Sequence, residues 1–123
     1  LRGAGGIVHD FYTGIEHCCE RVAAEIDGGV PEGPAWHRTL LQSMVLELPA
    51  LRPPVLRRET AHRVEEFLRF RLVFRNVYGF DMEWARLRAL LAAMPSCWAA
   101  VSADFGAFTL FLDQLAASDG EAE

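Results

Sequence analysis

The chain has 123 residues, of which 51% are hydrophobic and 24% charged, so it is long enough for one globular domain but not for two. This composition excludes a disordered or collagen-like chain. The net charge of -5 argues against indiscriminate long-range attraction to nucleic acid, and all twelve basic residues are arginines. These numbers still allow a local basic site.

Three cysteines stand at positions 18, 19 and 97, in neither a paired disulfide framework nor a spaced metal site. This usage is typical of a reducing cytoplasm, so we expect a cytoplasmic protein without a metal or another cofactor. No apolar run approaches the roughly 18 to 20 residues of a membrane span, and residues 1–6 lack the apolar centre of a signal peptide. The chain begins at Leu1 instead of Met, which leaves open whether further residues precede it.

Apolar residues at steps of three and four predict two helices in the first half of the chain. The first helix carries a stripe made of Ile7, Phe11, Ile15, Cys18, Val22 and Ile26. It ends at Gly28 and Gly29, because glycine readily adopts the positive φ that closes a helix. The second helix runs from Ala35 to about Leu48. Residues 49–57 contain Pro53 and form a connection, because proline lacks the amide hydrogen that a helix interior needs.

The longest uninterrupted pattern runs from about Arg58 to Tyr78 without glycine or proline. Asp81 occupies the N-cap position of a fourth helix that reaches Met94, and the chain restarts after Pro95 as a fifth helix. No segment alternates as a strand does. The sequence therefore predicts an all-α, antiparallel up-and-down bundle of about five helices over residues 1–117, followed by a disordered acidic tail at 118–123.

The segment from Arg52 to Arg75 is locally basic, because it contains seven arginines and only three glutamates. The rest of the chain has a net charge of -9. Arg69 has acidic neighbours at helical spacing, but Arg71 and Arg75 have none and lie four residues apart. Something outside the helix must compensate these two charges. One candidate is an acid on the first helix, Asp10, Glu16 or Glu20. The other is a phosphate group, which a guanidinium binds with two parallel hydrogen bonds, and both can hold at once.

Residues 70–79 read FRLVFRNVYG and resemble the signature of HepT-like proteins, which belong to the HEPN superfamily of small helical domains. That signature is an arginine, four further residues, a histidine, one residue and a tyrosine. The similarity extends upstream to HDFYTGIE at residues 9–16 and downstream to YGFDMEW at residues 78–84, so it covers most of the chain. Carried over by position, Arg71 matches the catalytic arginine and Tyr78 the modified tyrosine, while Asn76 stands in place of the catalytic histidine.

The resemblance implies a metal-independent endoribonuclease toxin, encoded beside a minimal nucleotidyltransferase antitoxin that silences it by transferring AMP to the motif tyrosine. It also implies RNA as substrate and a homodimer whose motifs face each other, with no part for DNA or a membrane. Asn76 departs from the pattern, because an amide cannot exchange the protons that RNA cleavage moves, although it can still hydrogen-bond a phosphate. We therefore expect impaired or absent nuclease activity, with phosphate binding by Arg71 and Arg75 retained.

Four histidines lie outside the motif. His62 precedes Arg71 by nine residues, which places it on roughly the opposite side of the helix and some 13 Å away along the axis. The sequence leaves the orientation of His9, His17 and His37 open, and a surface or core-edge position is the common one for such residues. The alternative function is a non-catalytic module for dimerisation or partner binding, in which Arg71 and Arg75 pair with acids and Tyr78 serves packing.

Overall fold

The computed structural model of the protein describes the backbone of residues 2–74 and 80–122, and the side chains of residues 3–70 and 84–119. These ranges form four helices: α1 (Arg2–Glu25), α2 (Trp36–Ser43), α3 (Arg58–Phe74) and α4 (Phe80–Ala122). The predicted all-α class is confirmed. The expected number of about five helices is corrected to four within the described residues.

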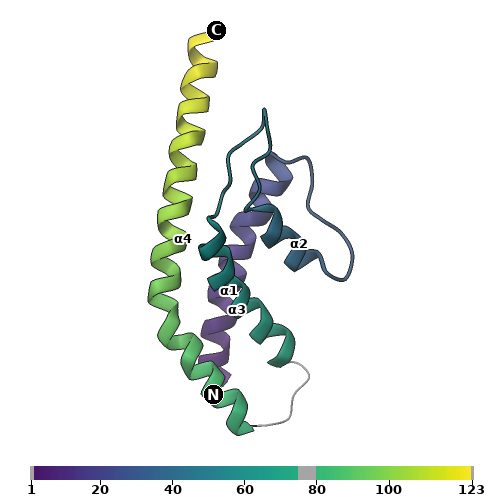
Figure 1. Ribbon diagram of the computed structural model, residues 1–123, viewed down its shortest axis with the longest axis vertical. Coiled ribbons are helices and arrows are strands. Elements are labelled where there is room, and N and C mark those ends of the chain that lie inside the picture. The colour runs from purple at the N-terminus through teal and green to yellow at the C-terminus, as the bar shows by residue number, and fades with distance from the viewer. Residues whose placement is uncertain (1, 75–79, 123) are drawn as a thin grey trace.

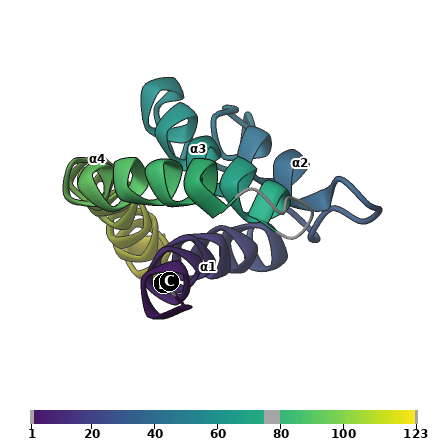
Figure 2. The same cartoon turned by 90° about the horizontal axis from the view of Figure 1, so that it is seen from below.

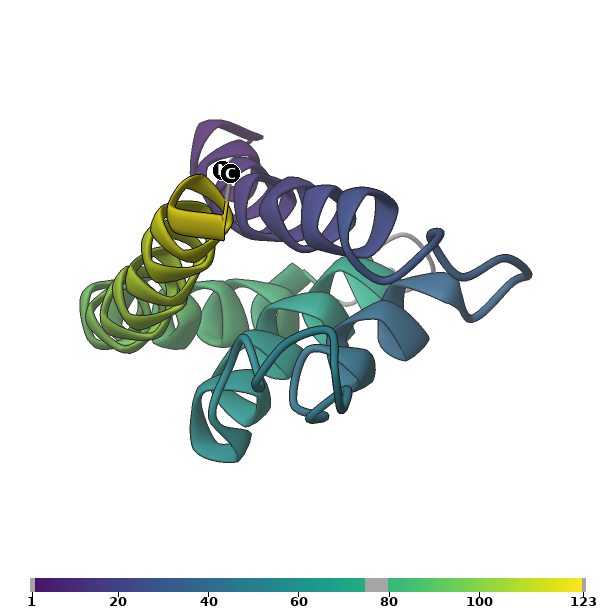
Figure 3. The same cartoon turned by 90° about the horizontal axis from the view of Figure 1, so that it is seen from above.

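The helices surround one core. α1 packs against each of the other three helices, and α3 packs against both α2 and α4. In Figure 1, α1 and α4 run upward and α3 runs downward across α1, so α3 is antiparallel to both. Figures 2 and 3, which look along the long axis, show α2 on the side of the molecule away from α4. The largest fully buried side chains come from α2, α3 and the connection between them: Phe67, Leu40, Met44, Leu56 and Leu68.

The buried face of α1 is displaced by one position from the predicted stripe. The buried hydrophobic residues on this helix are Val8, Tyr12, Ile15, Cys19 and Ala23. Ile7 and Cys18 of the predicted stripe are exposed. The shift follows from Tyr12, whose hydroxyl bonds to Glu16 one turn later, so that two polar residues accompany the apolar ones into the interior.

α2 is shorter than predicted, because the chain leaves the helix after Ser43 instead of at Leu48. The carbonyl of Met44 accepts the amides of Val55 and Leu56 at 2.8 and 3.1 Å, so the returning connection takes the hydrogen bonds that further helical residues would have made. Ala50 lies in this connection with a φ of 67°. The predicted connection over residues 49–57 is confirmed.

α4 is one helix of 43 residues where the sequence predicts two, and it continues through Pro95. A proline inside a helix removes one backbone hydrogen bond and costs about 3 kcal/mol, so tertiary packing must compensate. Leu87, Leu90, Cys97, Val101 and Phe108 supply it, because they are buried along both sides of Pro95. Figure 1 shows that the C-terminal end of α4 runs past the other elements. The helix reaches Ala122, beyond the start of the predicted tail.

Residues Trp84–Asp119 of α4 are long and apolar enough to cross a bilayer, with a mean hydropathy of 1.2 in the best window. The expectation that no apolar run approaches the length of a membrane span is corrected by this helix. The core helix of a soluble protein satisfies the same criterion, and α4 packs against α1 and α3. Length and hydropathy therefore do not assign this helix to a membrane.

Candidate functional site

One residue of the predicted site lies in a described helix. Arg71 stands in the last turn of α3, seven residues after Val64, so the two positions share a face of the helix and lie about 10 Å apart along its axis. The side chain of Arg71, and all of Arg75, Asn76 and Tyr78, lie outside the described residues. The described side of the site is the surface that α1 and α2 present to this face of α3.

Glu16 is the buried acid on that surface. Its side chain is 6% exposed, whereas Asp10 is exposed and Glu20 is half-buried. One carboxylate oxygen, Oε2, accepts hydrogen bonds from the Tyr12 hydroxyl and from Nδ1 of His37, the latter at 2.6 Å. Tyr12, Glu16 and His37 are called the Glu16 cluster below. Of the three acids proposed as partners for the motif arginines, Glu16 is therefore the one inside the bundle.

The Glu16 cluster lines a cavity between three helices. The residues that line it are Tyr12, Ile15, Glu16 and Cys19 of α1, His37, Leu40 and Leu41 of α2, and Val64 of α3. Most of this lining is apolar, and its polar side chains come mainly from the Glu16 cluster. The cavity reaches the face of α3 on which Arg71 lies two turns further along.

His37 lies at the edge of the core, as expected, but the sequence did not predict its partner. Its side chain is 21% exposed, and its ring lies 3.7 Å, centroid to centroid, from that of Trp36. Because an ionised carboxylate only accepts hydrogen bonds, Nδ1 of His37 donates to Glu16. No local spacing could reveal this pair, since the two residues are 21 positions apart.

The other three histidines, His9, His17 and His62, are exposed. His9 has one neighbour at hydrogen-bond distance, the Thr13 hydroxyl at 3.5 Å. For these three residues the expected surface position is confirmed.

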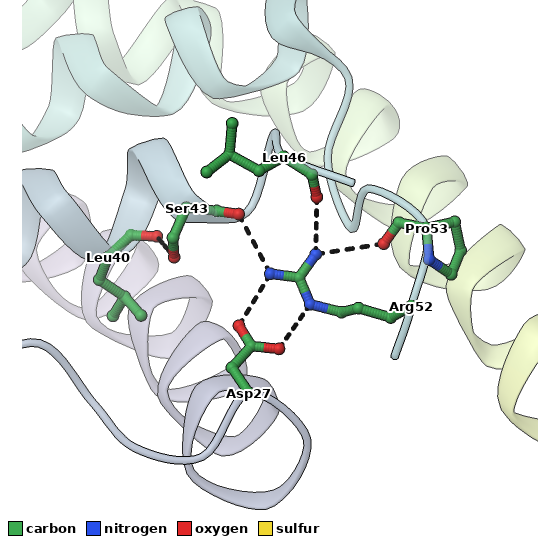
Figure 4. Close-up of polar contacts among 6 residues, drawn as sticks. All are labelled: Asp27, Leu40, Ser43, Leu46, Arg52 and Pro53. Atoms are coloured by element: carbon green, nitrogen blue, oxygen red, sulfur yellow. Dashed lines mark hydrogen bonds and ion pairs between the residues drawn. The ribbon is translucent and has the colours of Figure 1, made fainter. Parts of the chain in front are cut away.

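Arg52, counted in the basic segment, is a structural residue (Figure 4). Its side chain is 0% exposed, and two of its nitrogens donate to the two carboxylate oxygens of Asp27 at 2.7 and 2.8 Å. The remaining donors reach the backbone carbonyls of Leu46, Pro53 and Ser43 at 2.9, 3.1 and 3.1 Å. All five donors of the guanidinium are therefore used inside the protein, which leaves none for a ligand.

Arg57 is a second arginine with a structural partner. Asp104 of α4 accepts its backbone amide at 2.9 Å and its Nε at 2.7 Å. Burial tends to raise the pKa of Asp104, but the Arg57 amide, together with the side chains of Thr60 and Arg57, outweighs it and lowers that pKa. Arg69 lies 3.4 Å from Glu65, as its spacing predicts. The charge of the segment from Arg52 to Arg75 is thus partly neutralised.

Cys19 and Cys97 do not form a reactive or metal-binding site. Cys18, Cys19 and Cys97 are free, and burial raises the pKa of Cys19 to about 12 and that of Cys97 to about 11. A thiol with such a pKa stays protonated near neutral pH and is a poor nucleophile or ligand. In the part of the chain that the structure describes, no three His, Cys, Asp or Glu residues come together as a metal site.

Comparison with known proteins gives one family. A search of curated proteins and a search of solved structures both returned no match. A sequence model of a family described as "HepT-like protein" matches residues 4–112, which include α2, α3, the motif and most of α1 and α4. Because the match spans nearly the whole chain, it supports the resemblance drawn from residues 70–79, and the chain belongs to the HepT-like protein family.

Proposed function

We propose that this HepT-like protein is a cytoplasmic RNA-binding toxin of the ribonuclease type, with cleavage slowed because Asn76 replaces the motif histidine. Arg71 and Arg75 bind the RNA phosphate, and no metal takes part. The observation that carries the proposal is the family match over residues 4–112, which contains the arginine and the tyrosine of the motif at their expected spacing. RNA is the ligand that both the family and the arginine pair favour.

The position of Glu16 supports a role in orienting Arg71. Glu16 is buried beside a cavity that Val64 also lines, and Val64 shares its face of α3 with Arg71. A buried acid on this side of the bundle compensates a guanidinium and fixes its direction without consuming all five of its donors. The remaining donors then stay available for a phosphate.

Cleavage of RNA by three proteins tests the proposal: the natural chain, Asn76→His and Arg71→Ala. We expect Asn76→His to cleave faster by about a hundred- to ten-thousand-fold, which is the usual contribution of general acid–base catalysis. Arg71→Ala should lose both cleavage and binding of a 2′-O-methyl RNA that cannot be cut. Equal rates for the natural chain and Asn76→His would show that our interpretation of position 76 is wrong.

We further propose that a nucleotidyltransferase antitoxin binds the protein and transfers AMP to Tyr78. The tyrosine hydroxyl attacks the α-phosphate of ATP, loses its proton and releases pyrophosphate. Mass spectrometry after incubation with ATP and the nucleotidyltransferase of a neighbouring gene tests this step, with Tyr78→Phe as the control. The absence of an AMP adduct on the natural Tyr78 peptide would exclude it.

A homodimer is the third part of the proposal, and α4 supports it. Ten apolar residues of α4 alternate at steps of three and four: Trp84, Leu87, Leu91, Met94, Trp98, Val101, Phe105, Phe108, Leu112 and Leu115. This is the heptad spacing of helices that associate with other helices. Leu87, Val101 and Phe108 are buried inside the protein. In the other column, Leu91, Phe105 and Leu112 are half-buried against the core, whereas Trp84 and Trp98 are 38% and 53% exposed. We propose that a second copy covers this outer column.

The same surface supports the second candidate function, a non-catalytic module for dimerisation or for binding a nucleotidyltransferase. In this case Arg71 and Arg75 pair with acidic residues, and the protein does not bind RNA. Hydrogen exchange of the segment 58–80 with and without RNA separates the two functions. Slower exchange in RNA supports the ribonuclease-type protein, and unchanged exchange supports the module.

A further inference from the structure

We propose that the groove between α2 and α3 binds a phosphate group, with Arg38 and Arg58 as its main contacts. The groove is built from residues 38–65, so it is a site distinct from the motif at residues 70–79. Three features support it: the shape of the groove, the free donors of its two arginines, and the excess of positive charge around it.

The groove has an apolar base and a polar rim. At the base, Leu41 and Ala61 are buried and Val45 is half-buried, whereas Arg38 and Arg58 on the rim are exposed. α2 and α3 pack directly against each other, so the two walls of the groove are held together. Its volume of about 160 Å³ is roughly ten times what a single water molecule needs, so a phosphate group fits between the walls.

Arg58 is an exposed guanidinium that makes no ion pair or hydrogen bond within the part of the chain that the structure describes. The neighbouring carboxylates pair with Arg57 instead, Asp104 at 2.7 Å and Glu59 at 3.8 Å. Arg58 is also the first residue of α3, where the positive end of the helix dipole disfavours a cation. Because a bound anion offsets this repulsion, the position of Arg58 favours one.

Arg38 on α2 also keeps most of its donors free. Its Nε lies 3.8 Å from Glu65, which is an ion pair but exceeds hydrogen-bond distance. The same carboxylate lies 3.4 Å from Arg69, so Glu65 is shared between two arginines. Among the described residues, none accepts a hydrogen bond from the Arg38 guanidinium. In contrast to Arg52, Arg38 therefore has both terminal nitrogens available for a ligand.

His62 and Gln42 complete the polar rim. His62 follows Arg58 by four residues, so the two share a face of α3, and a neutral imidazole carries one N–H donor. The side-chain amide of Gln42 adds donors from α2. The ionised groups of the rim are the two guanidiniums and the single carboxylate of Glu65. The groove is therefore locally positive, although the chain as a whole carries -5.

The set of donors favours a phosphate over a carboxylate. The donors lie on two helices and belong to two guanidiniums, an imidazole and an amide. A carboxylate has two oxygens in one plane, which a single guanidinium satisfies, whereas the oxygens of a phosphate point in several directions and accept from several groups. A phosphate thus uses both walls of the groove. An RNA strand and a free nucleotide present this same group, and the experiment distinguishes them.

The test is titration calorimetry with three phosphate probes, namely inorganic phosphate, ATP without added metal, and a 2′-O-methyl RNA. Citrate, which has negative charge without phosphate, and adenosine, which has the nucleoside without phosphate, are the control ligands. Arg58→Gln and Arg38→Gln should each weaken binding of the phosphate probes by about ten- to a hundred-fold, the usual effect of losing a hydrogen bond to a charged group. Both residues are exposed, and unchanged circular dichroism spectra verify that the variants fold.

Arg63→Gln is the matched control variant, because it removes the same charge from an exposed position of α3 that does not line the groove. It should bind all probes like the natural chain. Weaker binding of RNA alone in Arg58→Gln and Arg38→Gln assigns the groove to an RNA strand, and weaker binding of ATP shows that a free nucleotide occupies it. Both results support the inference.

The inference is wrong if the natural chain binds none of the three probes, or if Arg58→Gln and Arg38→Gln bind them as tightly as the natural chain. It is also wrong if citrate binds as tightly as the phosphate probes, or if Arg63→Gln weakens binding as much as Arg58→Gln does. The proposed function fails separately. Loss of RNA binding in Arg71→Ala alone keeps that function and rejects the groove, whereas loss in Arg58→Gln but not in Arg71→Ala supports the groove and contradicts the role of Arg71.

Discussion

Asp104 of α4 accepts both the backbone amide and the guanidinium of Arg57, the residue that immediately precedes α3. A carboxylate at this place accepts a hydrogen bond from an amide at the start of the helix. Its negative charge also interacts favourably with the positive end of the helix dipole. The contact spans 47 positions of the sequence and joins the two helices on either side of the motif.

Asp104→Ala should lower the free energy of unfolding at pH 7 by about 1 to 3 kcal/mol, the usual cost of removing hydrogen bonds to a charged group. Because the folded protein lowers the pKa of Asp104, the stabilisation is complete above the unfolded value of about 4 and is lost as the pH falls through the lower folded value. Urea unfolding should be measured at pH 7 and at about pH 2.5, above and below that pKa of about 4. The free energies of unfolding of the two proteins should differ less at the lower pH. Asp113→Ala, at an exposed position of the same helix, serves as control.

Asp27→Ala should be more damaging, because it leaves the fully buried Arg52 guanidinium without its carboxylate. Breaking a buried ion pair from one side costs about 3 to 5 kcal/mol, a large fraction of the stability of a domain. Urea unfolding at pH 7 measures this loss. A cost below about 1 kcal/mol, typical of an exposed pair, would contradict the structural role assigned to Arg52. The exposed pair of Arg21 and Glu25 gives the comparison through Glu25→Ala.

The three thiols should differ in alkylation. Cys18 is exposed, whereas Cys19 and Cys97 are buried with a pKa raised to about 12 and about 11. Iodoacetamide at pH 8 should label Cys18 in the folded protein and reach the other two only after unfolding in urea, because the thiolate is the reactive form. Peptide mass spectrometry reads out each site. Rapid labelling of Cys19 in the folded chain would disagree with its position on the inner face of α1.

Trp98→Glu should disrupt the proposed homodimer, because it places a charge in the outer apolar column of α4. Light scattering coupled to size-exclusion chromatography should show a dimer for the natural chain and a monomer for the variant. Leu110→Glu is the control, since Leu110 is 62% exposed and lies outside the heptad positions. A monomeric natural chain, or equal effects of both substitutions, would rule out this interface.

Much of the fold is predictable from the sequence because helical spacing and helix breakers are local signals. The connection around Pro53 and the third helix follow from them, the helix as far as Phe74, since residues 75–78 of the predicted helix lie outside the described residues. The prediction of two helices separated at Pro95 was wrong. Proline tends to end a helix locally, but buried residues on both sides of Pro95 stabilise α4 as one helix. The buried face of α1 differs from the predicted stripe because Tyr12 carries a polar hydroxyl. The burial of this hydroxyl depends on its hydrogen bond to Glu16, one turn away.

The candidate site is less predictable for a related reason. Residues 70–79 identify the motif, since its arginine and tyrosine are close in sequence. The partners of buried charges come instead from other helices, as Glu16 and His37 show across 21 positions and Asp27 and Arg52 across 25. Such pairs leave no periodic signal, and Glu16 could be named only as one of three acids on α1.

The hydrogen bonds of the Arg52 guanidinium have a consequence for local unfolding of the protein. It binds Asp27 after α1, the carbonyl of Ser43 at the end of α2, and the carbonyls of Leu46 and Pro53 in the connection to α3. α2 has eight residues, too few to persist alone in water. Its native-state opening should therefore be coupled to that of the two segments on either side, so that the region from Asp27 to Pro53 exchanges its amides as one cooperative unit. Since His37 stands on α2, the lifetime of this unit would also be the lifetime of its hydrogen bond to Glu16.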